Sequence, residues 1–299
     1  MSNLNPLRVT VSPAWAGKTV DSFLQHKLGF SHRGVRALKK PGGILLDGHD
    51  VTVRERLKGG ETLVLGIAPL FQNITPDAID LEIIFEDQDL VVVNKPAGMV
   101  VHPVKKHQNG TLANALVYYW REQGETASFH PVHRLDRLTS GLVLIAKHPW
   151  AHQQLALQLE SGAMKRLYLA VCQGIPSLQS GKIIAPIKEF TTTAKREVLA
   201  EGRPSITRFR VLSKSVQSAL LAVKLLTGRT HQIRVHLAHL GNPLWGDPLY
   251  GTADPMFTRQ ALHAVRLCFT HPRTGLKIKL TTKIAPDIMA LLSEQGIKK

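Results

Sequence analysis

A single aspartate set between two arginines is the residue of this chain whose chemistry is easiest to define. Asp136 lies in HRLDRLTSG, residues 133–141, and is the only acidic residue between Glu125 and Glu160. Cations on either side favour the ionised form of a carboxylate. An ionised carboxylate can act as a nucleophile or a base, but an Asp that only caps a turn or pairs with Arg137 has the same neighbours. The rest of the pattern must decide between chemistry and structure.

A second unusual stretch, residues 202–246, is basic throughout. It contains no Asp or Glu, and its cations are Arg203, Arg208, Arg210, Lys214, Lys224, Arg229 and Arg234. Arg229 stands out because TGRTH places it in a turn between an apolar strand pattern and a helix pattern. The first backbone N–H groups of a helix and its dipole favour an anion at that point. We expect Arg229 to meet a phosphate or Asp136 itself.

The overall charge points to a polyanionic partner. The chain has 299 residues, with 38 Lys plus Arg against 22 Asp plus Glu, which gives a formal net charge of +16. Nucleic acid is the first expectation for such a balance. No apolar run approaches the roughly 20 residues that a membrane-spanning helix needs, and the N-terminus has no apolar signal core. We therefore predict a cytoplasmic protein with no membrane partner.

The periodicity divides the chain into two parts. Residues 1–69 contain two helix patterns, TVDSFLQHKLGF and SHRGVRALKK, followed by short strand patterns around an Asp-Gly turn. Residues 70–80 are polar and are predicted to be a linker. Residues 81–299 alternate strand patterns with a few helices. The expected strands include GLVLIAK, LYLAVCQG, ITRFRVLS and ALLAVKLL, and the expected helices include residues 149–160 and HQIRVHLAHLG.

Four motifs in this order resemble those of RluA-type pseudouridine synthases. They are NKPAGMVVHP (94–103), HRLDRLTSG (133–141), GRTHQIRVHLAHLGNPLWGDPLYG (228–251) and LHAVRLCFTHPRTG (262–275). The resemblance covers roughly residues 81–282. Residues 1–69 are similar, more weakly, to the alpha-L RNA-binding module that precedes this domain in the family. The implied fold is α+β, a catalytic domain on a mixed, largely antiparallel sheet with a small N-terminal RNA-binding module.

The resemblance implies isomerisation of uridine in RNA to pseudouridine, which needs no cofactor. Asp136 matches the family's aspartate, Tyr168 the tyrosine that lines the uracil pocket and could act as a base near carbon 5, and Arg229 the arginine that pairs with the aspartate. Arg134 matches the arginine beside the flipped nucleotide. His133 and Thr139 belong to the same motif and are expected to contact substrate. In the N-terminal module, Arg33, Arg36, Lys39 and Lys40 would face RNA.

Several alternatives stay open at this level. The aspartate could attack the sugar, attack the base or remove a sugar proton. A non-catalytic RNA-binding or ribosome-assembly factor would show the same charge. His231, His236 and His239 suggest a metal, but no carboxylate or thiolate lies nearby in the sequence to complete a site, so none is predicted. We expect a monomer that acts on ribosomal RNA of the large subunit, with transfer RNA as the second choice.

Overall fold

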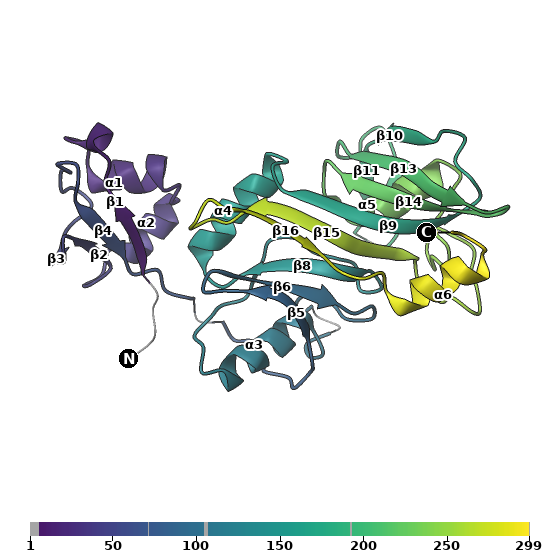
Figure 1. Cartoon of the computed structure of the whole chain (residues 1–299), viewed down its shortest axis with the longest axis horizontal. Helices are drawn as coiled ribbons and strands as arrows, with labels where there is room; N and C mark the ends of the chain where they lie inside the picture. The colour runs from purple at the N-terminus through teal and green to yellow at the C-terminus, as the bar shows by residue number, and fades with distance from the viewer. Residues whose placement is uncertain (1–5, 71, 105–106, 192, 299) are drawn as a thin grey trace.

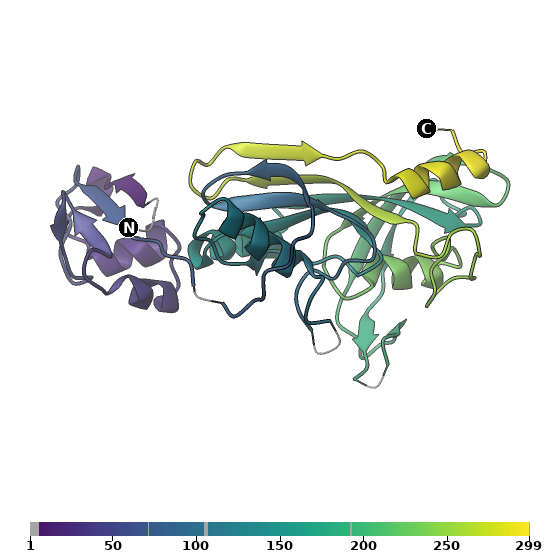
Figure 2. The same cartoon turned by 90° about the horizontal axis from the view of Figure 1, so that it is seen from below.

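The chain forms a small N-terminal unit beside a larger sheet-based domain (Figures 1 and 2). The computed structural model describes residues 6–70, 72–104, 107–191 and 193–298. No helix in these ranges is long and apolar enough to cross a membrane.

The N-terminal unit is a four-stranded antiparallel sheet with helices on one side. Its strand order is β1-β4-β2-β3. The sheet comprises β1 (Leu7–Thr10), β2 (Ile44–Leu46), β3 (His49–Asp50) and β4 (Thr62–Leu65), and the helical elements are η1 (Pro13–Trp15), α1 (Val20–Ser22), η2 (Phe23–Lys27) and α2 (His32–Leu38). Ser31 caps α2, since its hydroxyl accepts a bond from the Gly34 N–H at 3.1 Å. The two predicted helix patterns and the strands after them are present, but β1, which precedes the helices and pairs with β4, was not predicted.

The larger domain is built on one ten-stranded sheet. Its main path runs β10-β13-β14-β9-β15-β8-β6-β5, with β16 paired to β15 and β7 to β8. Only the β15–β8 pair is parallel within the described sheet. The strands are β5 (Glu82–Glu86), β6 (Leu90–Lys95), β7 (His130–Pro131), β8 (Ser140–Ala146), β9 (Lys165–Gln173), β10 (Ser180–Ile184), β13 (Ile206–Lys214), β14 (Ser218–Leu225), β15 (Leu262–Thr270) and β16 (Lys277–Thr281). The α+β fold with a mixed, largely antiparallel sheet is confirmed.

Helices cover different faces and ends of this sheet. They are α3 (Leu112–Glu122), α4 (Pro149–Glu160), α5 (Gln232–His239) and α6 (Pro286–Glu294), and a separate hairpin, β11 (Ile187–Glu189) with β12 (Arg196–Val198), projects from the domain (Figure 2). Residues of α3 and α4 join two different hydrophobic clusters, with alternate residues of β8 in each cluster. Every residue of β8 is therefore buried, as expected for a strand covered on both faces.

The described residues of the predicted linker, 70 and 72–80, form no helix or strand but are held against the larger domain. Gln72 exchanges two hydrogen bonds with the backbone of Phe129, at 2.6 and 3.0 Å. The Asn114 side chain on α3 donates to the Thr75 carbonyl at 2.7 Å. The segment thus follows the surface of the domain along a fixed path.

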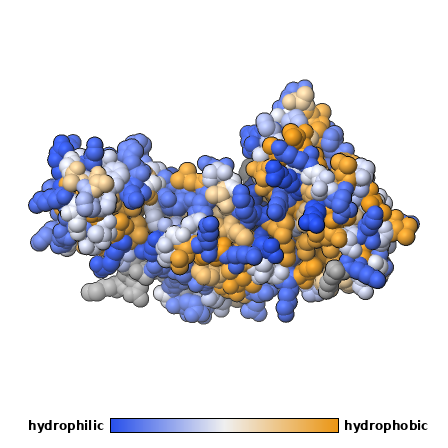
Figure 3. All heavy atoms as spheres, turned by 45° about the horizontal axis from the view of Figure 1, so that its top comes forward, coloured by the Kyte–Doolittle hydropathy of each residue, from blue (hydrophilic) through white to orange (hydrophobic). Residues whose placement is uncertain are grey.

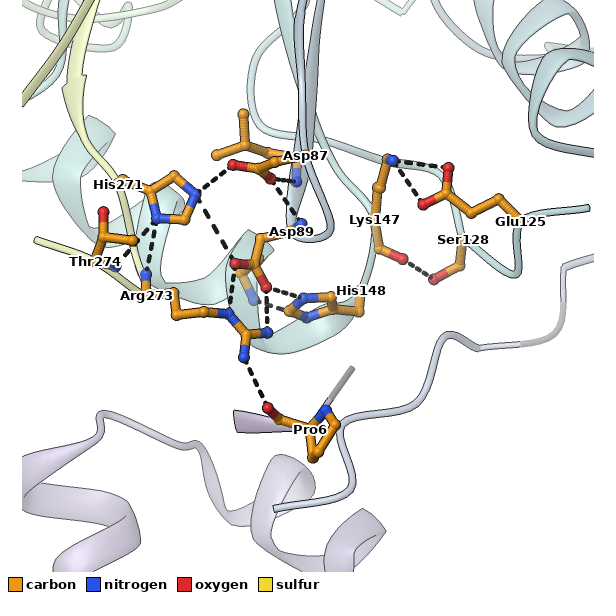
Figure 4. Close-up of polar contacts among 12 residues, drawn as sticks. Pro6, Asp87, Asp89, Glu125, Ser128, Lys147, His148, His271, Arg273 and Thr274 are labelled. Carbon is orange, nitrogen blue, oxygen red and sulfur yellow. Dashed lines mark hydrogen bonds and ion pairs between the residues drawn. The ribbon is translucent and has the colours of Figure 1, made fainter. Parts of the chain in front are cut away.

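A buried polar cluster lies where the two units meet (Figure 4). Asp89 is fully buried and accepts bonds from Arg273, at 2.6 and 2.7 Å, and from His148 at 2.8 Å. Burial alone raises the pKa of a carboxyl, but these bonds outweigh it and hold the pKa of Asp89 below its usual range. Arg273 also donates to the Pro6 carbonyl at 3.0 Å. The residue directly before β1 is thereby bonded to the polar cluster of the larger domain.

Helix α4 forms the other half of this junction. The Gln153 and Gln154 amides donate to the Gly29 carbonyl at 2.7 and 3.1 Å. Phe30 stacks on Trp150 with ring centroids 5.9 Å apart. One hydrophobic cluster contains residues of both units, so the N-terminal module packs on the larger domain as well as being joined to it by the chain.

We expect the double substitution Gln153→Ala/Gln154→Ala to loosen the N-terminal module without unfolding either unit. Both side chains are only partly buried, and their loss removes the bonds that fix the Gly29 carbonyl. Limited proteolysis should then cut between the units faster than in the wild type. The matched control is Gln158→Ala on the same helix, which removes two bonds to Thr270 inside the larger domain. Equal cleavage of both variants would contradict a docked module.

Candidate active site

The loop that carries Asp136 connects β7 to β8 and is held at several points. The Lys95 ammonium is fully buried and donates to the carbonyls of Pro96, Met99 and Arg137, at 2.8, 2.8 and 3.2 Å. Burial lowers the pKa of Lys95 to about 7, and the charge of Asp136 acts in the opposite direction. Three carbonyls match the three protons of the ammonium form. Lys95 therefore fixes the backbone of the residue that follows Asp136.

The loop ends in the sequence Thr-Ser-Gly, and each of these residues has a contact that requires it. The Thr139 hydroxyl is buried and accepts a bond from the Gln260 amide at 3.0 Å. The Ser140 hydroxyl bonds His263 at 2.9 Å. Gly141 has φ +112°, and a Cβ there would lie 2.4 Å from the Ala264 carbonyl oxygen. Only glycine allows β8 to approach β15 this closely, and this approach sets the position of the loop.

The ion-pair partner of Asp136 is Arg234, not Arg229. Arg234 Nη1 lies 3.2 Å from the Asp136 carboxylate, and His231 Nε2 lies 3.9 Å away. Arg234 is in the first turn of α5, where its side chain points into the domain. Arg229 stands in the turn before the helix and forms no ion pair with a described carboxylate. The pairing predicted from the sequence is corrected for this reason.

Arg234 bridges two carboxylates. Its Nε and Nη2 each lie 2.7 Å from an oxygen of Asp247, which is fully buried. Burial lowers the pKa of a guanidinium, but the two carboxylates outweigh it and raise the pKa of Arg234. Asp247 also accepts from the backbone N–H groups of Leu249 and Tyr250. Asp247 therefore fixes the orientation of Arg234, whose Nη1 points to Asp136.

Arg229 borders the site as a cation that forms no ion pair with any carboxylate in the described part of the chain. Its backbone N–H bonds the Gln232 side chain at 2.9 Å, which fixes the turn. Its Nε is buried and has no hydrogen-bond partner. The side chain borders the same recess as Asp136. This arrangement fits the other alternative left open by the sequence, an anion supplied by the ligand.

Asp136 lies in a small recess that opens into a larger cavity of about 730 Å³. The recess is bordered by Arg134, Leu135, Asp136, Thr139, Tyr168, Leu225, Arg229, His231, Gln232, Ile233, Arg234 and Leu262. Arg134, Asp136, Tyr168 and Arg229 also border the larger cavity, together with His133 and Arg166. The structure thus brings together every site residue that the sequence predicted in the larger domain.

Tyr168 and His133 are both buried and uncharged at neutral pH. Burial raises the pKa of Tyr168, while the nearby Arg166 guanidinium acts in the opposite direction. Burial, with Arg166 nearby, lowers the pKa of His133 to about 3. His133 Nε2 accepts from the Leu144 N–H at 3.3 Å, so the proton of the neutral ring lies on Nδ1. The remaining predicted residues, Arg33, Arg36, Lys39 and Lys40, are exposed on or just after α2 in the N-terminal module.

The histidines that suggested a metal do not form one group. Both ring nitrogens of His236 are bonded, to Thr207 and to the Ala185 carbonyl, and His231 bonds Tyr250. Within the described ranges, the one cluster with metal-ligand types is Asp87, Asp89 and His271. There the Arg273 guanidinium already neutralises Asp89 (Figure 4).

Comparison with known proteins shows the family of this chain. Residues 89–239 match the family model described as RNA pseudouridylate synthase. The chain belongs to this family. It is an RNA pseudouridine synthase, an isomerase that acts on RNA, and the resemblance seen in the sequence is confirmed.

Two curated relatives match over most of their length. An uncharacterized RNA pseudouridine synthase of Bacillus subtilis (strain 168), YlyB, is 36% identical over 97% of this chain and 98% of its own. Ribosomal large subunit pseudouridine synthase D of Pseudomonas aeruginosa is 39% identical over 85% of this chain and 84% of its own. Among solved structures, human RNA pseudouridylate synthase domain containing 1 is similar to this synthase with TM-score 0.58 and 26% identity, over 72% of this chain and 88% of that chain.

Proposed function

We propose that Asp136 is the catalytic group of this synthase. The observation that supports the assignment is its position. Of the residues that border the recess, Asp136 alone carries a carboxylate, and a buried guanidinium orients it. Glycoside hydrolysis commonly uses a second carboxylic acid as a proton donor, and the recess provides none. A single carboxylate is suited to an isomerisation in which the base leaves the sugar, turns and is joined again.

The atoms of the reaction define what the site must do. The bond between nitrogen 1 of uracil and the sugar breaks, the bond from carbon 5 forms, carbon 5 loses its proton and nitrogen 1 gains one. Asp136 begins this sequence by attacking the sugar, attacking the base or removing a sugar proton. Tyr168 borders the recess with its hydroxyl in neutral form, because burial raises its pKa. We therefore assign its ring to holding uracil, and a base role to it only if the bound RNA lowers that pKa.

The cations around the recess are suited to the RNA backbone. Arg134 is exposed beside Asp136, and Arg229 has an unpartnered nitrogen. Both can contact phosphates of the target strand, with the uridine extruded into the recess at an unstacking cost of a few kcal/mol. Thr139 borders the recess and His133 borders the larger cavity, where both are proposed to contact the substrate. Arg33, Arg36, Lys39 and Lys40 contact a neighbouring part of the RNA.

The substrate that we favour is large-subunit ribosomal RNA, with transfer RNA as the second choice. The names of relatives such as ribosomal large subunit pseudouridine synthase D of Pseudomonas aeruginosa support this order. We further propose that the protein is a cytoplasmic monomer. The test is to map pseudouridines by chemical sequencing in a strain that lacks this protein. Loss of one or more large-subunit sites, restored by the wild-type chain, is expected, whereas loss confined to transfer RNA would reverse the order.

Binding to RNA should depend strongly on salt. A net charge of +16 acting on phosphates releases counterions, so log affinity falls linearly with log salt concentration. We expect a slope of several units, roughly 0.7 to 0.9 for each phosphate contacted. A titration of a target RNA at four salt concentrations measures it. An affinity that barely changes between low and moderate salt would contradict an electrostatic interface.

A further inference from the structure

The face of the sheet that points away from Asp136 carries exposed cations on six of the ten strands. Side chains alternate across a strand, so Tyr168 and Leu225 point to the recess while their neighbours Leu167 and Lys224 point to the other side. We call this other side the outer face. Its exposed cations are Lys165 on β9, Lys182 on β10, Arg208 and Arg210 on β13, Lys224 on β14, Arg266 on β15, and Lys277 and Lys279 on β16.

Three of these cations are direct cross-strand neighbours. Lys182 pairs in register with Arg208, and Arg208 pairs with Lys224. The row continues through Leu167 to Arg266. With strands about 4.8 Å apart, the row from Lys182 to Arg266 spans about 19 Å. Like charges opposite each other on adjacent strands destabilise a sheet.

No acidic residue compensates for this repulsion. The strands β9, β10, β13, β14, β15 and β16 contain no Asp or Glu at all. No ion pair within the described ranges involves the cations of the row. A fold that keeps several like charges in register without counter-charges loses stability in the free protein. A bound polyanion would offset that loss.

Another part of the outer face is covered by the protein itself. At the far end of the same strands, the outward residues Val171 and Leu220 are apolar and pack with Ile288 and Leu291 of α6. In Figure 3, hydrophobic side chains are concentrated on the right, the side on which Figure 1 labels α6. The outward-facing residues of these strands thus change from apolar to cationic beyond the part that α6 covers.

The composition of the uncovered part indicates the kind of polyanion. None of its outward positions on these strands is aromatic, so it offers no platform for stacking unpaired bases. It is also part of a sheet rather than a helix that could enter a groove. Cations spread over such a surface contact phosphates, and phosphate contacts carry no sequence information. Double-stranded RNA is recognised largely in this way, by backbone and shape.

We propose that the outer face binds the phosphate backbone of a second, double-stranded segment of the RNA substrate, on the opposite side of the sheet from the target uridine. The inference rests on the proposed RNA substrate and extends it. An RNA that reaches both faces must be large and folded, which is a property of the substrate that the active site alone does not define.

The test is the triple variant Lys182→Gln/Arg208→Gln/Lys224→Gln. The matched control, Arg121→Gln/Lys195→Gln/Lys298→Gln, removes the same number of charges from exposed positions of the larger domain outside the row. Binding is measured with a long structured RNA that contains the target and with a short hairpin that contains only the target loop. For the long RNA we expect about 10-fold weaker binding at moderate salt and a salt slope smaller by about 2 to 3 units. Binding to the short hairpin and its single-turnover conversion should match the control.

A second measurement needs no RNA. Removing like charges that face each other should leave the melting temperature of the triple variant at low salt equal to or above that of the wild type. Equal loss of long-RNA affinity in variant and control would show a general charge effect and overturn the proposal. Unchanged binding of both RNAs would also overturn it and would favour an acidic protein partner. Failure of the proposed active site would appear separately, as loss of conversion with both RNAs in the wild type.

Discussion

Asp136→Asn is expected to bind target RNA at least as tightly as the wild type and to form pseudouridine slower by several orders of magnitude. The substitution keeps the shape of the side chain and its bond to Arg234, but it deletes the negative charge and the nucleophilic oxygen. Removal of one negative charge from a surface that faces phosphates does not weaken binding. An essential nucleophile or base, in contrast, acts only in the chemical step.

The measurement is single-turnover conversion at saturating enzyme, beside a binding titration with the same RNA. Asp80→Asn serves as the control, because it removes the same charge from an exposed position outside the site. The control should convert RNA at the wild-type rate. Substantial product from Asp136→Asn would refute the catalytic assignment, and loss of fold and binding together would assign Asp136 a structural role.

Much of the larger domain could be predicted because the pattern of apolar and polar residues in each strand indicates which of its faces are buried. β13 alternates buried and exposed residues, which marks a half-buried strand, and β8 is continuously apolar, which marks a strand covered on both faces. Helix α3 lies outside the predicted elements, although Thr111 and Asn114 form a capping box at its start. Thr-x-x-Asn is a weaker signal than a box that ends in Glu or Gln.

The partner of Asp136 could not be decided from local sequence. Arg229 and Arg234 belong to the same acid-free stretch, and a helix start favours an anion near Arg229. The deciding contact comes from Asp247, the first acidic residue after that stretch, which binds Nε and Nη2 of Arg234. The available signal was the position of Arg234 directly after the core residue Ile233. An arginine that is buried beside the apolar stripe of a helix needs a buried carboxylate as its partner.

The docked N-terminal module is a second feature that sequence spacing cannot reveal. Its contacts join residues more than 100 positions apart, such as Gly29 with Gln153 and Pro6 with Arg273. The polar composition of residues 70–80 suggests a linker, and the described residues of this segment contain no helix or strand. Composition does not show that Gln72 and Asp77 bind the surface of the neighbouring domain.

Arg234→Lys is expected to lower the single-turnover rate by about 100-fold or more while RNA affinity changes little. Arg234 uses three nitrogens to hold two carboxylates at once, and one ammonium cannot reproduce that planar geometry. A displacement of about 1 Å in a catalytic group can cost about 100-fold in rate. Arg234→Ala should instead destabilise the whole domain by about 3–5 kcal/mol, since it leaves Asp247 buried and unpaired.

Arg229→Lys is the matched comparison, because it tests the partner that the sequence suggested. Arg229 makes no ion pair with Asp136, so lysine there should weaken RNA binding several-fold and leave the single-turnover rate at saturation near that of the wild type. Urea unfolding of both variants separates a loss of orientation from a loss of fold. A slow Arg229→Lys beside a fast Arg234→Lys would show that RNA binding rearranges the site and brings Arg229 to the carboxylate. The opposite result would identify Arg234 as the residue that aims Asp136 at the bound uridine.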